Sequence, residues 1–242
     1  MNPMTRDSAT WPKREVTRLE GFSDAVFAFA LTLLVVSLEV PKTFDELVVT
    51  LRGAAAFAVC FALFWLIWKE HHRFFGRYGL ADGKTSFLNA VLLFGVLLYV
   101  YPLKFLFTIM LGPLLGAVRD PSIDPIRPEQ VRPLMVIYSS GYAALWAVFA
   151  LMYRHAYAQR HALHLDGRQT FETRAQGGAM VAHMCIGLLS VLIALLAPSQ
   201  LAGSAAGLTY FLVGPAQWMY WARVAKRRKV EFAPAKVAAK AT

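Results

Sequence analysis

Polar side chains crowd one end of the first long apolar stretch of the sequence. Arg18, Glu20 and Asp24 precede fourteen uncharged residues, among which Thr32 and Ser37 are the only polar ones. Ionisable groups at the end of a membrane helix need partners, because an unpaired charge in lipid is costly. A hydroxyl oxygen on an otherwise apolar path can replace water around a passing cation. The pattern therefore predicts an anchoring network at one end of a helix, followed by either an ion path or an ordinary packing surface.

The apolar residues of this stretch form a narrow stripe when they are placed on a helix. At about 100° per residue, Phe22, Phe29 and Val36 fall on one side, Thr32 lies close by, and Arg18 is one turn before Phe22. A ring of such side chains would block ions by dewetting and would open by widening. The stripe would equally suit ordinary helix packing, and periodicity alone does not separate the two interpretations.

The composition indicates the elements that carry these residues. Of the 242 residues, 57% are hydrophobic and 17% are charged, against about 25% charged in a soluble domain. The apolar residues gather into six blocks, each long enough for the roughly 20 residues that cross a bilayer. We therefore expect an all-α polytopic membrane protein, with one domain over 1–242. The expected helices are 13–40, 53–72, 86–108, 133–155, 176–197 and 203–225, followed by a basic cytosolic tail at 226–242.

The distribution of basic residues predicts the orientation. Nineteen of the 25 Lys and Arg residues lie in the N-terminal stretch, the second and fourth loops, and the C-terminal tail. Because basic loops stay on the cytoplasmic side, both termini are expected in the cytoplasm. The KRRK run at 226–229 follows the last span, where it favours contact with anionic lipid headgroups over binding of nucleic acid.

Motifs of several other classes are missing from the sequence. It contains no P-loop, no HExxH, no TVGYG filter and no arginine ladder. Cys60 and Cys185 fall inside expected spans, so a disulfide framework is not indicated. The other histidines lie at helix ends and in loops, and His183 is the one histidine within an apolar block, where it suits either a hydrogen-bonded structural role or proton handling. We expect neither a cofactor nor a bound metal.

The opening motif resembles the RxxxFSD signature of the transmembrane protein 175 family, the potassium channels of endolysosomal membranes and their prokaryotic relatives. Supporting residues follow in the second and third spans, near the same inner level of the membrane. The matching residues are Arg18, Phe22, Ser23 and Asp24 in the motif, with Trp68, His71, His72 and Asn89 in the later spans.

The resemblance implies a homotetramer in which the first helix of each copy lines a central pore. The motif residues would tie the first three helices together, whereas Phe29, Thr32 and Val36 would form the constriction, the selectivity layer and an outer apolar layer. Phe29 departs from the isoleucine or leucine that is usual in the family. The implied function is a potassium-selective or weakly selective cation channel, with potassium as the permeant ion, in a prokaryotic plasma membrane.

Three alternatives remain at this point. A secondary transporter usually shows inverted repeats and helices broken at mid-membrane, and no repeat is evident here. A membrane enzyme would need clustered reactive groups, and the nearest candidates, Glu70, His71, His72 and Asp82, are scattered. A non-conducting structural membrane protein would assemble without passing ions. We expect the protein not to be an enzyme.

Overall fold

The regular structure of the described residues is entirely helical. The computed structural model describes residues 10–11, 14–36, 42–111 and 127–232. Six helical passes are present in these residues, because α6, η2 and α7 follow one another without a gap, and the all-α class is thereby confirmed. The elements are α1 (Arg18–Val36), α2 (Phe44–Tyr78), α3 (Gly83–Leu111), α4 (Pro128–Ala158), α5 (Gly167–Leu196), α6 (Ser199–Leu208), the 3₁₀ helix η2 (Thr209–Leu212) and α7 (Val213–Glu231).

Several helices extend beyond the apolar blocks. The sequence predicts the second helix over 53–72, whereas α2 covers Phe44–Tyr78. The fifth helix begins at Gly167, ahead of its apolar block, because the Asp166 carboxylate accepts a hydrogen bond from the backbone N–H of Gln169 at 2.7 Å and caps the helix. Hydropathy locates the part of a helix that lies in lipid, and a capped helix continues past it. Likewise, α7 includes the beginning of the expected basic tail, while 233–242 lie outside the described residues.

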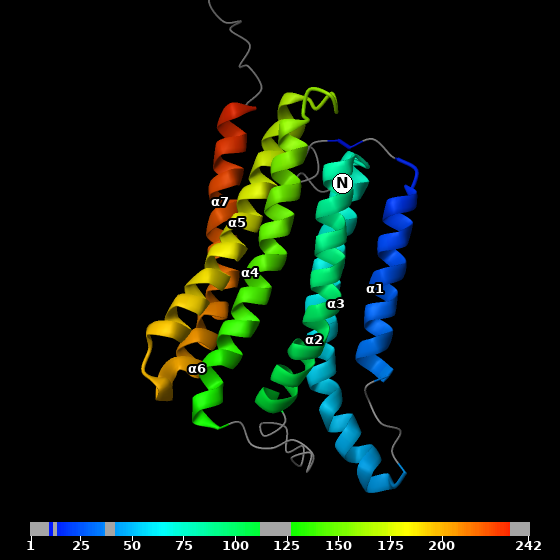
Figure 1. The fold of residues 1–242 in the computed structure, drawn as a ribbon. Coiled ribbons are helices and arrows are strands. Elements are labelled where there is room, and N and C mark those ends of the chain that lie inside the picture. Colours follow the sequence, from blue (N-terminus) through cyan, green and yellow to red (C-terminus); the bar gives the residue numbers. More distant parts are fainter. Residues whose placement is uncertain (1–9, 12–13, 37–41, 112–126, 233–242) are drawn as a thin grey trace, which may run out of the picture.

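The helices run roughly side by side, with α1, α2 and α3 on one side and α4, α5, α6 and α7 on the other (Figure 1). α3 packs against both α1 and α4, and α5 packs against α4, α6 and α7. The beginning of α1 and the end of α7 lie at the same end of the molecule (Figure 1). This arrangement agrees with an even number of passes through a membrane.

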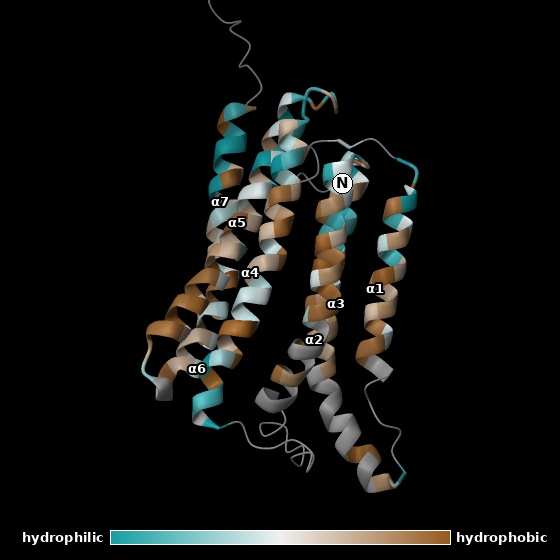
Figure 2. Ribbon diagram, viewed as in Figure 1, coloured by the Kyte–Doolittle hydropathy of each residue, from teal (hydrophilic) through white to brown (hydrophobic). Residues whose placement is uncertain are grey.

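Hydropathy varies along the bundle in the way a membrane requires. Apolar residues dominate the middle of the helices, and hydrophilic residues gather at the end where α1 begins and α7 ends (Figure 2). Among the described residues, two helical segments are long and apolar enough to span a bilayer by themselves, Glu129–Ala158 and Gly167–Leu196, and a shorter apolar segment covers Gly83–Tyr99. These properties fit a polytopic membrane protein.

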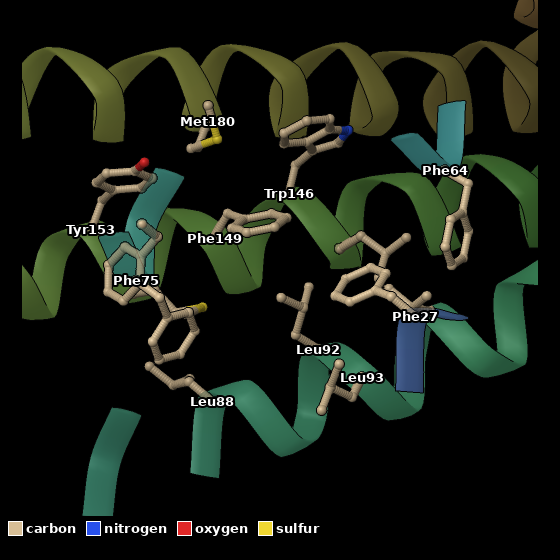
Figure 3. Packing of buried hydrophobic residues seen from close by; sticks show 14 of the residues in the cluster. Phe27, Phe64, Phe75, Leu88, Leu92, Leu93, Trp146, Phe149, Tyr153 and Met180 are labelled. Atoms are coloured by element: carbon tan, nitrogen blue, oxygen red, sulfur yellow. The ribbon is translucent and has the colours of Figure 1, made fainter. Parts of the chain in front are cut away.

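A continuous core joins the two sides of the bundle. Since lipid chains are as apolar as these side chains, close packing stabilises the contact more than removal from water does. Aromatic rings from α1, α2 and α4 meet aliphatic side chains of α3 in this core (Figure 3). Its labelled members in Figure 3 are Phe27, Phe64, Phe75, Leu88, Leu92, Leu93, Trp146, Phe149, Tyr153 and Met180.

Candidate ion pathway and its anchoring network

A chain of hydrogen bonds ties α1 to α3 and α2. The Ser23 hydroxyl donates to the backbone carbonyl of Leu19 at 2.8 Å, and the Asn89 side-chain N–H donates to the Ser23 oxygen at 2.9 Å. The Asn89 amide oxygen lies 2.9 Å from Nε2 of His71. Because that oxygen can only accept, Nε2 of His71 carries the proton of this bond. Ser23, His71 and Asn89 are buried, so the Ser23 hydroxyl, the Asn89 amide and Nε2 of His71 depend on these hydrogen bonds.

A second link joins α1 to α2 on another face. The Trp68 indole N–H donates to Oδ1 of Asp24 at 2.9 Å. Trp68 also stacks on the ring of His72, with centroids 5.3 Å apart, and Nδ1 of His72 lies 3.8 Å from a carboxylate oxygen of the buried Glu20. Two separate sets of polar contacts therefore fix both the position and the rotation of α1 at this end.

Two residues of the motif take no part in these contacts. Arg18 is exposed, and no ion pair joins it to Asp24 in the part of the chain that the structure describes. Phe22 is 61% exposed. Among the described residues, Trp68 is the hydrogen-bond partner of Asp24. The role that the resemblance implies for Arg18 stays a prediction.

The predicted stripe is the uncovered face of α1. Phe29 is 58% exposed, and Thr32 is exposed beside it. The small residues Gly21, Ala25 and Ala28 are exposed as well, which leaves room for another helix to approach closely. The side chain of Val36 lies outside the described residues.

The opposite face of α1 is buried. Phe27, Ala30 and Leu34 enter the core, and the Phe27 ring packs against Phe64 at 5.4 Å and against His71 at 5.2 Å between centroids. These residues recur at intervals of three and four, as they must to share one helix face. One sequence therefore gives α1 a packed face and a bare face, and Phe29 and Thr32 lie on the bare one.

The Thr32 side chain has a fixed orientation on that face. Its hydroxyl donates to the backbone carbonyl of Ala28 at 2.9 Å. The hydroxyl proton is therefore directed into the helix, and the lone pairs of the oxygen point outward. An outward lone pair is suited to a cation, because a cation is bound by acceptor oxygens.

Sequence reasoning missed a buried hub on α2. The Glu70 carboxylate accepts hydrogen bonds from the Tyr153 hydroxyl at 2.6 Å, from the Gln176 amide at 2.8 Å, and from Arg73. Glu70, Tyr153 and Gln176 are all buried. The hub connects α2 to α4 and α5, and only the local Glu70–Arg73 spacing was visible in the sequence, because the other partners are distant along the chain.

The other residues considered for an enzyme also have structural partners. In the turn before α3, Asp82 accepts hydrogen bonds from Thr85 and, at 2.8 Å, from Nε2 of His155. Burial acts to raise the pKa of Asp82, but these hydrogen bonds and the adjacent His155 outweigh it, and the pKa lies below its ordinary value. Among the described residues, no group of three His, Cys, Asp or Glu side chains could hold a metal ion.

His183 has the surroundings of a structural histidine. Its Nδ1 lies 2.8 Å from the Tyr142 hydroxyl, and its ring stacks on Trp146 with centroids 4.2 Å apart. Cys60 and Cys185 do not form a disulfide. None of these residues lies on the uncovered face of α1, since all belong to other helices.

Fold and site together define a polytopic α-helical membrane protein whose first helix is held at one end and left bare along one face. A family model described as the endosomal/lysosomal potassium channel TMEM175 matches residues 18–99, which contain the whole network. A potassium channel of Marivirga tractuosa is 40% identical over 190 residues, which are 76% of this chain and 77% of that protein. The chain belongs to the TMEM175 potassium channel family, and this is a family of channels, not of enzymes.

Further relatives agree with this assignment. A potassium channel of Streptomyces collinus is 30% identical over 138 residues, which are 54% of this chain and 63% of that protein. The crystal structure of a variant of the potassium channel MtTMEM175, in complex with a nanobody–MBP fusion protein, superimposes with a TM-score of 0.80 at 36% identity. That match covers 93% of this chain and 99% of the other, so the likeness extends beyond the motif to all of the helices.

Proposed function

We propose that this protein is a potassium channel in which α1 of four copies surrounds a central pore. Family membership and the potassium channels among its relatives support the class of function. The observation that carries the pore assignment is the bare face of α1, on which Phe29 and Thr32 are exposed in a helix that is otherwise packed and anchored. A face of this kind needs a partner, and copies of the same helix arranged around an axis supply one.

Phe29 forms the constriction in this proposal. Four phenylalanine rings around an axis make an apolar ring, from which water withdraws when the ring is narrow. An ion inside such a ring would lose its hydration without gaining oxygen ligands, so the ring closes the pore to ions. Opening then requires that α1 tilts or that the Phe29 ring changes rotamer.

Thr32 forms the layer that prefers potassium. Its oxygen points outward because its proton is committed to the Ala28 carbonyl, and four such oxygens replace part of the hydration shell of a cation. Potassium holds its water less tightly than sodium does, so potassium loses part of its shell at a lower cost. The preference is therefore for potassium, and it depends on the hydroxyl oxygen.

The anchoring network keeps these residues on the axis. Hydrogen bonds from Asn89 to Ser23 and from Trp68 to Asp24 prevent α1 from rotating, and a rotation of about 100° would replace each pore residue by its neighbour. We place both termini in the cytoplasm of a prokaryotic cell, because most basic residues belong to that side. The basic end of α7 then contacts anionic headgroups of the inner leaflet.

Flux measured in liposomes tests the proposal. The purified protein is reconstituted, and potassium and sodium flux are compared under equal gradients. We expect potassium flux to exceed sodium flux, Thr32→Ala to remove most of the preference, and Phe29→Ala to raise the flux of both ions. Ser140→Ala is the matched control, because Ser140 is also exposed and its hydroxyl also donates to a carbonyl of its own helix, in α4.

The outcomes separate the alternatives. An unchanged preference in Thr32→Ala, or an equal loss in Ser140→Ala, removes Thr32 from the selectivity layer. The absence of any flux, even with Phe29→Ala, contradicts the channel function and favours a structural role. Saturable flux coupled to a second solute indicates a transporter. Cross-linking in the membrane then counts the subunits, and a number other than four overturns the arrangement proposed for α1.

A further inference from the structure

A hollow of about 310 Å³ lies between α1 and α2, and it does not include Phe29 or Thr32. On α1 its lining residues are turned by roughly 100–160° from Phe29 around the helix axis. Its volume is in the range of small-molecule sites, which begin at roughly 300 Å³. We call it the α1–α2 pocket, and it is lined by Asp24, Phe27, Ala28, Leu31, Phe61, Phe64, Trp65 and Trp68.

The pocket combines aromatic walls with one carboxylate. Five of its eight lining side chains are aromatic. The rings of Trp65 and Trp68 lie 4.8 Å apart at 37°, and Trp65 is 50% exposed. The carboxylate of Asp24 receives the Trp68 N–H on Oδ1, and no ion pair to Asp24 is formed within the described residues. The pocket therefore presents negative charge and aromatic faces together.

This chemistry selects one class of ligand. Aromatic faces attract cations, and aromatic enclosures are the usual sites for quaternary ammonium groups. A potassium ion would lose its hydration in the pocket and gain a single carboxylate, which is unfavourable. A quaternary ammonium ion donates no hydrogen bonds and carries an apolar shell, so it gains both from the aromatic rings and from the Asp24 charge.

We propose that the α1–α2 pocket binds a small organic monocation, a quaternary ammonium with an alkyl or aryl body, taken from the aqueous phase. The ligand is wedged between α1 and α2, beside the Trp68–Asp24 hydrogen bond. It does not occupy the Phe29–Thr32 stripe, so it does not compete with permeating potassium. The site is thus distinct from a pore-blocking site.

Binding of benzyltrimethylammonium to the purified full-length protein tests this site by isothermal titration calorimetry. We expect saturable binding that is unchanged when potassium replaces sodium at constant ionic strength. Trp65→Ala should weaken binding at least about fivefold, since it removes the exposed aromatic wall. Trp218→Ala is the matched control, because Trp218 is a more exposed tryptophan of α7, far from the pocket in sequence, and its loss should leave binding unchanged.

The charge is tested separately. Asp24→Asn keeps an oxygen that can accept the Trp68 N–H, and it should also weaken binding at least about fivefold. Phe61→Ala is a second test of the aromatic wall that does not depend on the folding of the Asp24 variant, because Phe61 lines the pocket and is 42% exposed, and it should also weaken binding. Equal binding by Trp65→Ala and Trp218→Ala, or competition by potassium, overturns the proposal.

One further measurement identifies the source of the ligand. Loss of probe binding in phosphatidylcholine nanodiscs, with binding retained in phosphatidylglycerol nanodiscs, would mean that a lipid headgroup fills the pocket, and it would overturn the assignment to a soluble cation. Equal binding in both supports the assignment. Binding is measured without ion flux, so a failure here leaves the channel function standing, and a silent channel leaves this site testable.

Discussion

Replacement of Glu70 by alanine should destabilise the protein through the partners that it leaves behind. The Tyr153 hydroxyl and the Gln176 amide both donate to Oε1 of Glu70, and both residues are buried. A buried donor without an acceptor costs about 1–3 kcal/mol, so the two together cost about 2–6 kcal/mol. The Arg73 side chain is 34% exposed and regains water, so it adds little.

The free energy of unfolding can be measured by titration with sodium dodecyl sulfate in mixed micelles, followed by tryptophan fluorescence. Glu70→Ala should lower it by about 2–6 kcal/mol. Glu129→Ala serves as the control, because Glu129 is an exposed carboxylate of α4 and its loss should change stability by less than about 0.5 kcal/mol. Glu70→Gln keeps one acceptor oxygen and should fall between the two.

A double-mutant cycle decides whether the stated cause is correct. In the natural background Tyr153→Phe removes a hydrogen bond and should cost about 1 kcal/mol. In the Glu70→Ala background the same change removes an orphaned hydroxyl, so it should cost nothing or restore stability. The reasoning is refuted if Tyr153→Phe costs the same in both backgrounds, or if Glu70→Ala is as stable as the Glu129→Ala control.

Two further predictions concern sites away from the pore. Asp82 accepts a hydrogen bond from His155, and its pKa in the folded protein is lowered. Its contribution to stability is therefore complete above the ordinary pKa of 3.8, and it is lost as the pH falls through the lower folded pKa. Asp82→Asn should therefore flatten the acid limb of a plot of unfolding free energy against pH, and an unchanged limb would contradict the shift. A Cβ atom added at Gly141 would lie 2.6 Å from the Tyr99 ring, so Gly141→Ala should lower the free energy of unfolding by about 1–3 kcal/mol. A Cβ atom added at Gly207 meets open space, so Gly207→Ala should leave the free energy of unfolding unchanged or raise it by up to about 1 kcal/mol. Equal stabilities for these two variants in the same titration would show that the ring moves freely.

The sequence predicted the number of helices well and their ends poorly. Six apolar blocks are visible because each helix that crosses the bilayer needs a long run of side chains that are stable in lipid, and hydropathy measures that stability directly. The extension of α2 to Tyr78 was missed, because this part is amphipathic and its stability comes from contacts such as the hydrogen bond from Tyr78 to Thr173. Contacts between residues so far apart in the chain leave no periodic signal.

The sequence predicted the exposed stripe of α1 better than the hydrogen bonds that hold the helices together. The bare stripe with Phe29 and Thr32 follows from helical spacing, and α1 does expose these residues. The sequence also suggested that His71 and Asn89 lie at one level, but not which atoms meet. The Glu70 hub escaped prediction altogether, because a lone glutamate next to Arg73 has the same pattern as an exposed ion pair, and only the fold supplies the Tyr153 hydroxyl.

The hydrogen bond from Thr32 to Ala28 also has a consequence for the biogenesis of the protein. A newly inserted subunit has no neighbours, so the bare face of α1 meets acyl chains first. Because the hydroxyl proton is already bonded within the helix, Thr32 offers lipid no unsatisfied donor, and its polar side chain does not penalise the lone subunit on that account. In the proposed arrangement of α1, insertion and assembly can therefore be separate events in time. The number of pores would then depend on how often subunits meet in the bilayer as well as on synthesis.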